Sequence, residues 1–282
     1  MMSGSDPNKV FNTVEDVVRF FCRHLVSLSG WCQTVNSDGT LSEQDQFFSF
    51  SGFIISIRGV WNFVTAGHIL KPLEERIRNQ EVKVKEFLLV DRFGPDTVSQ
   101  YAIPFDYTNA PKLFMDNEEA GLDFGLIILR QNYCDLLKAN GIVPVLEENW
   151  KTIPNELADN YVMLGFPKQL IQTITVSDNG IKRMAGSVAP AAVGIKRLNE
   201  IPDGVATTKF PRFIGKLADS GYVLEDITGM SGGPIIGFNE EWNRYWIVAI
   251  QSRWLGESRI TFGCLISVFA NLVDEWLAGS EP

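Results

Sequence analysis

The sequence predicts an all-β protein with an α-helix at each end. From residue 47 onward, short runs of β-branched and aromatic residues are separated by turns, and they fall into two blocks on either side of a connector at 131–160. Before the first block and after the second, apolar residues recur at helical spacing. With 282 residues and 45% hydrophobic content, the chain can bury a sizeable core. Two successive β-barrels are therefore expected.

The N-terminal segment is expected to form an amphipathic helix. Apolar residues recur at helical spacing over residues 12–29, Thr13 can cap the start, and Gly30 can end the helix. His24 lies near the C-terminal end, where a cation is mildly favoured, and is interpreted as structural or solvent-facing. Residues 1–45 are accordingly assigned to an N-terminal helical extension.

The first barrel is expected within residues 46–140 and the second within residues 141–282. The strands expected in the first are Phe47–Ile57, Val60–Thr65, Val84–Val90, Tyr101–Phe105 and Phe124–Leu129. Those expected in the second are Tyr161–Gly165, Ile171–Val176, 185–189, Ala206–Phe213, Pro234–Phe238, Tyr245–Gln251 and Ile260–Leu265. Apolar residues at helical spacing from Ile266 to Leu277 then predict a C-terminal helix.

Charge and hydropathy argue against two classes of partner. The formal net charge is −9, whereas phosphate binding needs a basic surface, so no nucleic-acid partner is expected. No apolar run approaches the roughly 20 residues of a membrane span, and the start of the chain lacks the features of a signal peptide. We expect no membrane partner and a cytoplasmic location.

The four cysteines are scattered along the chain, at Cys22, Cys32, Cys134 and Cys264. In a cytoplasmic protein they are expected to be reduced and mostly buried. No Cys-x-x-Cys spacing occurs and the chain has only two histidines, so no metal site is expected.

The segment from Gly229 to Pro234 places Ser231 among glycines. Such a backbone can turn sharply and aim the N–H groups of Gly229 and Ser231 at one point. That arrangement is typical of a nucleophile with its own oxyanion hole. An ordinary Gly-Gly-Pro turn is the structural alternative.

A serine hydroxyl needs a base within hydrogen-bond reach before it can attack a carbonyl carbon. Apart from the histidine of the N-terminal helix, the chain has only His68, which follows Thr65-Ala66-Gly67 at the end of an apolar run. His68 is therefore the candidate base. A buried core histidine is the alternative interpretation.

A buried carboxylate would hold this imidazole in the right tautomer and stabilise its protonated form. Asp123 stands directly before the apolar run 124–129 and is the candidate. Asp116, Glu118 and Glu119 are close in sequence, but they lie in a polar loop where solvation would weaken their effect. A strand-capping role for Asp123 is the alternative.

The three motifs occur in the order His68, Asp123, Ser231. On these motifs the chain resembles the chymotrypsin/trypsin-like serine proteases, in particular their disulfide-free bacterial members. The α/β-hydrolases share the Gly-x-Ser-x-Gly pattern, but their histidine follows the serine, and none follows Ser231 here. The resemblance implies two six-stranded antiparallel β-barrels and a trypsin-like serine endopeptidase that uses a catalytic triad. A polypeptide substrate and no cofactor are also implied.

The resemblance also suggests a specificity. In trypsin-like enzymes the floor of the primary pocket lies six residues before the nucleophile, which here is Glu225. A buried carboxylate there would favour Lys or Arg in the substrate, with Asp226 reinforcing it; in the other interpretation both acids face water. Ser252 lies where the family's substrate-pairing strand would run, although Arg253 stands where a tryptophan is usual.

One departure from the family concerns activation. Trypsin-like zymogens use a new N-terminus, usually Ile-Val-Gly-Gly, which pairs with an aspartate directly before the nucleophile; here that position is Met230 and the tetrapeptide is absent. The oxyanion loop is therefore expected to form without N-terminal cleavage. A regulatory protein engaging the N-terminal helix would restrain the protease. A catalytically silent peptide-binding module and an esterase are the alternative functions.

Overall fold

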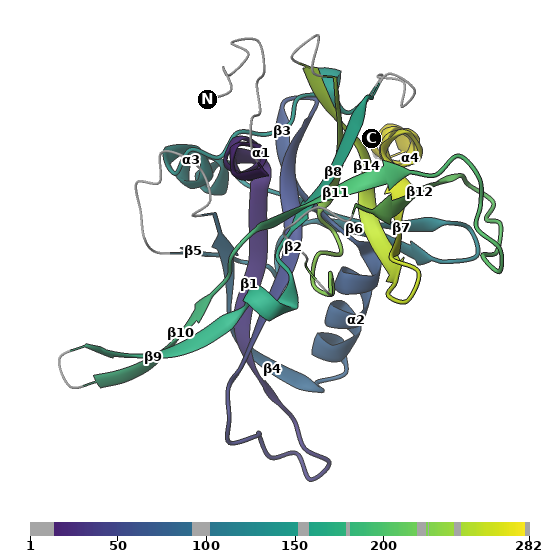
Figure 1. Ribbon diagram of the computed structural model, residues 1–282. Helices are drawn as coiled ribbons and strands as arrows, with labels where there is room; N and C mark the ends of the chain where they lie inside the picture. The colour runs from purple at the N-terminus through teal and green to yellow at the C-terminus, as the bar shows by residue number, and fades with distance from the viewer. Residues whose placement is uncertain are drawn as a thin grey trace, which may run out of the picture.

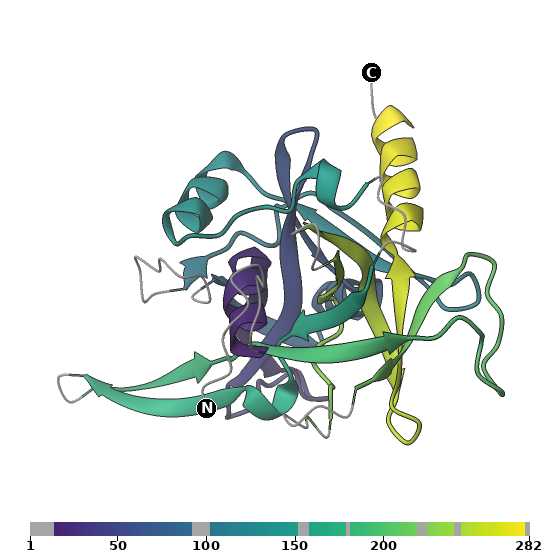
Figure 2. The same cartoon turned by 45° about the horizontal axis from the view of Figure 1, so that its top comes forward.

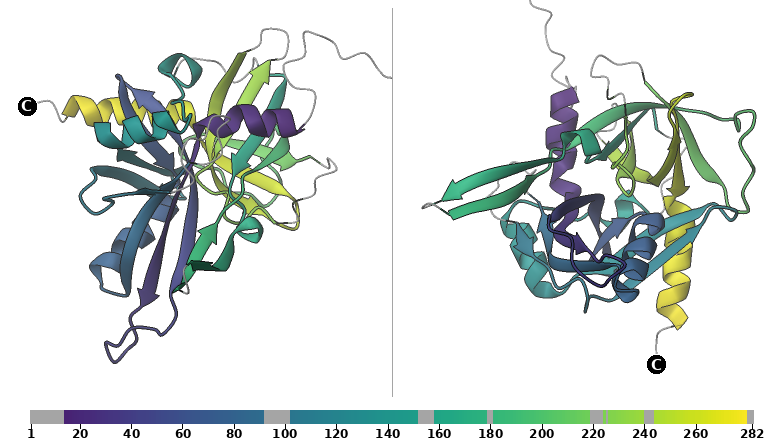
Figure 3. Two further views of the ribbon diagram at one scale, coloured as in Figure 1. Left: turned by 90° about the vertical axis from the view of Figure 1, so that its left-hand side faces the viewer. Right: turned by 90° about the horizontal axis from the view of Figure 1, so that it is seen from below.

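The computed structural model describes residues 14–91, 102–151, 158–178, 181–218, 224, 226–239 and 244–279. Within these residues the chain forms two β halves that lie side by side (Figures 1 and 3). No described helix has the length and apolar character needed to cross a membrane.

The first half is one antiparallel sheet with the strand order β5-β4-β1-β2-β3-β7-β6. Its strands are β1 (Leu25–Thr34), β2 (Gln46–Ile57), β3 (Val60–Thr65), β4 (Val82–Val90), β5 (Ile103–Pro104), β6 (Lys112–Asn117) and β7 (Leu122–Ile128). The expected six-stranded first barrel is corrected to a seven-stranded sheet. Strand β1 comes from the segment expected to be helical, and β6 was not expected as a strand.

The N-terminal helix is shorter than expected. Helix α1 covers Val14–Phe21, a 3₁₀ turn follows at Cys22–His24, and the chain then enters β1, which pairs with β2 on one side and β4 on the other. The first eight residues of β1 are buried. Because the strand is covered on both faces, its apolar residues do not alternate, and their recurrence matches a helix equally well. The prediction of a helix over 12–29 is therefore wrong beyond residue 24.

The second half is a closed six-stranded barrel, as predicted, with the order β11-β12-β15-β14-β13-β8. Its strands are β8 (Asn160–Gly165), β11 (Ala191–Arg197), β12 (Arg212–Leu217), β13 (Pro234–Asn239), β14 (Arg244–Leu255) and β15 (Ile260–Leu265). Two strands expected in this barrel instead form a separate hairpin, β9 (Gln172–Asp178) and β10 (Ile181–Ser187), which projects from the body (Figure 2).

Two further helices lie in the first half, α2 (Gly67–Arg78) and α3 (Gln131–Ala139), and neither was expected. Helix α3 occupies part of the connector. Helix α2 follows β3 directly and packs against β6 and β7, so its first turn meets the strand that carries Asp123. The predicted C-terminal helix is present as α4 (Ile266–Gly279).

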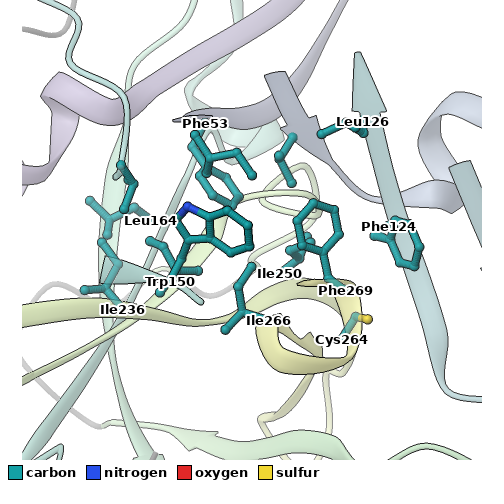
Figure 4. Packing of buried hydrophobic residues seen from close by; sticks show 14 of the residues in the cluster. Phe53, Phe124, Leu126, Trp150, Leu164, Ile236, Ile250, Cys264, Ile266 and Phe269 are labelled. Atoms are coloured by element: carbon teal, nitrogen blue, oxygen red, sulfur yellow. The ribbon is translucent and has the colours of Figure 1, made fainter. Parts of the chain in front are cut away.

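One cluster of buried side chains spans both halves. Its members include Phe53 of β2 from the first half, Leu164 of β8 and Ile236 of β13 from the second half, Trp150 of the connector and Phe269 of α4 (Figure 4). Burying one large apolar side chain stabilises the fold by roughly 1.5–3 kcal/mol. Because this cluster crosses the boundary, it fixes how the two halves meet, and with them the residues at the junction.

Candidate active site

Asp123 and His68 form a hydrogen-bonded pair in the first half. The backbone N–H of His68 donates to Oδ1 of Asp123 at 2.9 Å, and Nδ1 lies 2.7 Å from Oδ2. A carboxylate only accepts hydrogen bonds, so Nδ1 carries a proton, and in the neutral imidazole Nε2 then presents a lone pair. The Asp123 side chain is 10% exposed and that of His68 is 31% exposed. The carboxylate is thus shielded, while the imidazole is accessible.

Gly67 brings the start of α2 onto the strands beneath it. A Cβ at this position would collide with the carbonyl oxygen of Met115 on β6 and would lie 2.8 Å from that of Phe124 on β7. Only glycine allows this approach. The glycine of the Thr-Ala-Gly-His motif therefore has a direct role in placing His68 against Asp123.

A buried thiol from the second half lies next to Asp123. Burial raises the pKa of Cys264 to about 11, although the backbone N–H of Asp123 acts in the opposite direction by donating to the sulfur. The thiol is therefore neutral at pH 7 and adds no second negative charge beside the carboxylate. All four cysteines are buried, as the sequence predicted.

Ser231 lies in the loop that precedes β13. Gly229 and Gly232 have φ angles of 97° and 87°, which glycine adopts without strain. Within the described residues, the N–H groups of Gly229 and Ser231 have no hydrogen-bond acceptor, whereas those of the three other loop residues donate to backbone carbonyls. The two N–H groups without acceptors are those that the sequence assigned to the oxyanion hole.

The hydroxyl of Ser231 donates to the backbone carbonyl of Ser252 at 3.1 Å. His68, Ser231 and Ser252 line one cavity of about 850 Å³. The predicted nucleophile, base and substrate-binding residue therefore line the same cavity. In this state the serine hydroxyl is hydrogen-bonded to the Ser252 carbonyl and not to His68. Among the described residues, Nε2 of His68 has no hydrogen-bond partner.

Two contacts fix the nucleophile loop against the first half. The hydroxyl of Ser51 on β2 donates to the carbonyl of Gly229 at 2.7 Å and accepts from the N–H of Phe166 at 2.7 Å. Gly232 packs so closely that a Cβ would collide with the hydroxyl of Thr65 and lie 2.6 Å from the carbonyl of Ser51. Since Thr65 closely precedes His68, this contact ties the loop to the strand that leads to the base.

The cavity wall carries charged residues that the sequence did not assign to the site. Glu118, between β6 and β7, forms an ion pair of 2.7 Å with Arg253 of β14. The guanidinium of Arg212, the first residue of β12, lies 4.9 Å from the ring centroid of Phe262. No local sequence pattern points to Arg212, because its place in the wall depends on the pairing of β12 with β15.

Glu225, expected at the pocket floor, lies outside the described residues. Its neighbour Asp226 is exposed and accepts a hydrogen bond of 2.7 Å from the N–H of Thr228. Asp226 thus faces solvent and shapes the turn leading to the nucleophile loop. Across the described part of the chain, no three His, Cys, Asp or Glu side chains gather in a way that could hold a metal ion.

The second histidine does not line the cavity. His24 is buried, with Nδ1 2.6 Å from the carbonyl oxygen of Val143 and Nε2 2.8 Å from the hydroxyl of Tyr245. Burial lowers the pKa of His24 to about 4, and the hydrogen bond to Val143 opposes this shift only partly. His24 is therefore a neutral structural residue, one of the two interpretations drawn from the sequence.

The described chain thus joins a closed six-stranded barrel to a seven-stranded antiparallel sheet, and residues from both halves line the cavity that holds His68 and Ser231. No protein-family model matches the chain, and no curated protein sequence does. Similar solved structures include the Mycobacterium tuberculosis protein Rv3671c in an inactive mutant form, 13% identical with a TM-score of 0.45, covering 100% of this chain and 98% of that one. Tobacco etch virus protease with its substrate is 11% identical, with a TM-score of 0.41 and coverage of 92% and 86%. A Glu endopeptidase is 10% identical, with a TM-score of 0.45 and coverage of 90% of each chain.

Proposed function

We propose that this protein is a serine endopeptidase in which Ser231 is the nucleophile, His68 the general base and Asp123 its orienting partner. One observation carries the proposal. The Asp123 carboxylate holds His68 by two hydrogen bonds, with the lone pair on Nε2, and His68 lines the same cavity as Ser231. A neutral imidazole held in this tautomer is what proton removal from a serine requires.

In the first step the Ser231 hydroxyl leaves the Ser252 carbonyl and turns to Nε2 of His68. The oxygen attacks the substrate carbonyl carbon as its proton moves to Nε2, and Asp123 stabilises the resulting imidazolium. The N–H groups of Gly229 and Ser231 receive the developing oxyanion. Loss of one such donor costs on the order of 3 kcal/mol in the transition state.

The imidazolium then returns its proton to the leaving amine as the peptide bond breaks, which leaves an acyl ester on Ser231. Water attacks this ester as His68 accepts its proton. His68 then returns that proton to the Ser231 oxygen as the ester bond breaks, which releases the carboxylic acid and restores the free hydroxyl. The substrate would lie extended along β14, where the Ser252 carbonyl, once free of the serine hydroxyl, can accept a hydrogen bond from the substrate backbone.

Labelling with a fluorophosphonate probe, combined with hydrolysis of a peptide library, tests this function. The wild type is expected to react and to cleave peptides, whereas Ser231→Ala and His68→Ala lose both activities. Ser258→Ala, in an exposed turn outside the cavity, should behave as the wild type.

Two outcomes would contradict the proposal. Peptide binding without labelling or cleavage by the wild type would indicate a silent binding module. Hydrolysis of simple esters with no response to residues flanking the bond would indicate an esterase. The preference for Lys or Arg suggested by Glu225 is a separate proposal, which cleavage profiling on the peptide library tests.

A further inference from the structure

One cation in the cavity wall has no carboxylate partner. In the described part of the chain, Arg212 forms no ion pair; its guanidinium lies over Phe262 and donates to the carbonyl of Ala206 at 3.0 Å. These two contacts hold the planar group in place and leave other N–H donors for a ligand. Both Arg212 and Phe262 line the cavity that contains Ser231.

We propose that Arg212 makes this cavity select peptides with an acidic side chain, Glu or Asp, near the cleaved bond. The inference rests on the proposed peptidase function and names its substrate class. A guanidinium binds a carboxylate through two parallel hydrogen bonds, which gives both affinity and orientation. An unpaired charge that is partly removed from water raises the free energy of the protein, and pairing with a substrate carboxylate would offset this desolvation penalty.

The guanidinium of Arg212 is only partly exposed to solvent. Burial lowers the pKa of Arg212 from its ordinary value, Glu118 opposes the shift, and the like charge of Arg253 adds to it. Arginine nevertheless remains protonated in proteins, so the wall keeps a positive charge at this point.

The other charged side chains of the cavity are either paired or screened by solvent, so Arg212 is the charge available to a ligand. Arg253 is already paired with Glu118 at 2.7 Å, and both side chains are about half exposed, so solvent and salt also screen them. Glu119 also lines the cavity, but it is exposed, so solvent and salt screen it. His68 is already paired with the Asp123 carboxylate at 2.7 Å. The partly buried guanidinium of Arg212 is therefore the least screened unpaired charge among the described residues of the wall.

The position of Arg212 also places it beside the bound peptide. Arg253 follows Ser252 on β14 and pairs with Phe262 on β15, the residue on which Arg212 stacks. A peptide that extends along β14 from Ser231 would thus pass the guanidinium. An acidic side chain of such a peptide is the group that would reach Arg212.

Cleavage profiling on a peptide library, followed by matched peptides with Glu or Gln at the selected position, tests the inference. The wild type is expected to cleave the Glu peptide with a kcat/KM roughly tenfold or more above that of the Gln peptide, the usual size of a charged hydrogen bond. Arg212→Gln should bring this ratio close to one, and Arg212→Lys should keep part of it. Arg244→Gln, an exposed arginine on β14 outside the cavity, is the matched control and should keep the wild-type ratio.

Glu118→Gln adds a second test. It frees Arg253 and removes a carboxylate that repels an acidic peptide, so the Glu-to-Gln ratio should rise. Enrichment of Lys or Arg in the profile would overturn the inference and support the Glu225 pocket. A preference for Glu that persists unchanged in Arg212→Gln would also overturn it.

Binding to a Ser231→Ala background separates this inference from the proposed function. Fluorescence polarisation with the same two peptides measures recognition without turnover. If no variant hydrolyses peptides, yet Ser231→Ala binds the Glu peptide better and the added Arg212→Gln abolishes the difference, the peptidase function fails while the recognition stands. Hydrolysis with equal rates and equal binding for both peptides would reject the acidic specificity alone.

Discussion

The two histidines of this chain share a tautomer but differ in surroundings. In both, Nδ1 donates to an oxygen: that of the Asp123 carboxylate for His68, and that of the Val143 carbonyl for His24. His68 is partly exposed, whereas His24 is buried and also bonded to Tyr245. A carboxylate stabilises an imidazolium, while a neutral carbonyl in a desolvated site does so far less. The chemistry of the partner and access to solvent therefore decide which histidine can act as a base.

The largest effect is expected from removing the charge of the partner. Asp123→Asn can donate its amide N–H to Nδ1, which would place the proton on Nε2 and leave no base facing Ser231. We expect kcat to fall by roughly 10⁴-fold, with little change in melting temperature. Asp116→Asn is the matched control, because Asp116 lies opposite Asp123 on the neighbouring strand. A loss below tenfold in Asp123→Asn would show that His68 does not depend on this carboxylate.

A smaller effect is expected when the base is kept and the nucleophile loop is displaced. Gly232→Ala would force a Cβ into Thr65 at a positive φ, so the loop must move away from the first half. We expect a loss of probe labelling on the order of 100-fold and destabilisation of several kcal/mol. Gly59→Ala also has a positive φ but opens into free space, so it should cost only about 1 kcal/mol and leave labelling intact. Equal labelling rates for the two variants would contradict the proposed docking.

The smallest effect is expected on stability at acidic pH, where the buried His24 becomes protonated. The pKa of His24 is about 4 in the folded chain and 6.5 in its ordinary state, so the unfolded chain binds more protons between these values. Stability present above pH 6.5 should therefore be lost as the pH falls towards 4, by at most roughly 3 kcal/mol from this residue. Urea unfolding from pH 7.5 to 4 should show a shallower pH dependence for His24→Gln than for the wild type. His68→Gln is the control, and the same slope in both variants would contradict the assignment.

His68, Asp123 and Ser231 could be predicted from the sequence as candidate site residues, because each lies in a short motif whose glycines or apolar neighbours determine the local backbone. Gly67 and Gly232 illustrate this, since each permits a contact that a side chain would block. The catalytic roles of the three residues are predictions, which Ser231→Ala, His68→Ala and Asp123→Asn test.

Contacts between distant segments were not predictable in this way. The Ser51 hydroxyl donates a hydrogen bond to the Gly229 carbonyl, although the two residues are 178 positions apart in the sequence. Arg212 reaches the cavity only because β12 pairs with β15. Neither residue stands in a recognisable local pattern. Strands β8, β13, β14 and β15 of the second barrel were predicted because they are bounded by turns, whereas β11 was not predicted. Helix α2 was also missed, although Leu70, Leu73 and Ile77 recur at helical spacing in its sequence.

The place of β1 inside the sheet bears on how proteolytic processing can be studied. Cutting the chain at residue 45 would remove this strand from between β2 and β4, and would leave two unpaired strand edges and an opened core. An inactive fragment of that kind would report a broken sheet and would say nothing about maturation. A shortened chain intended to mimic a processed form should therefore begin before Val14, where helix α1 and everything after it stay whole.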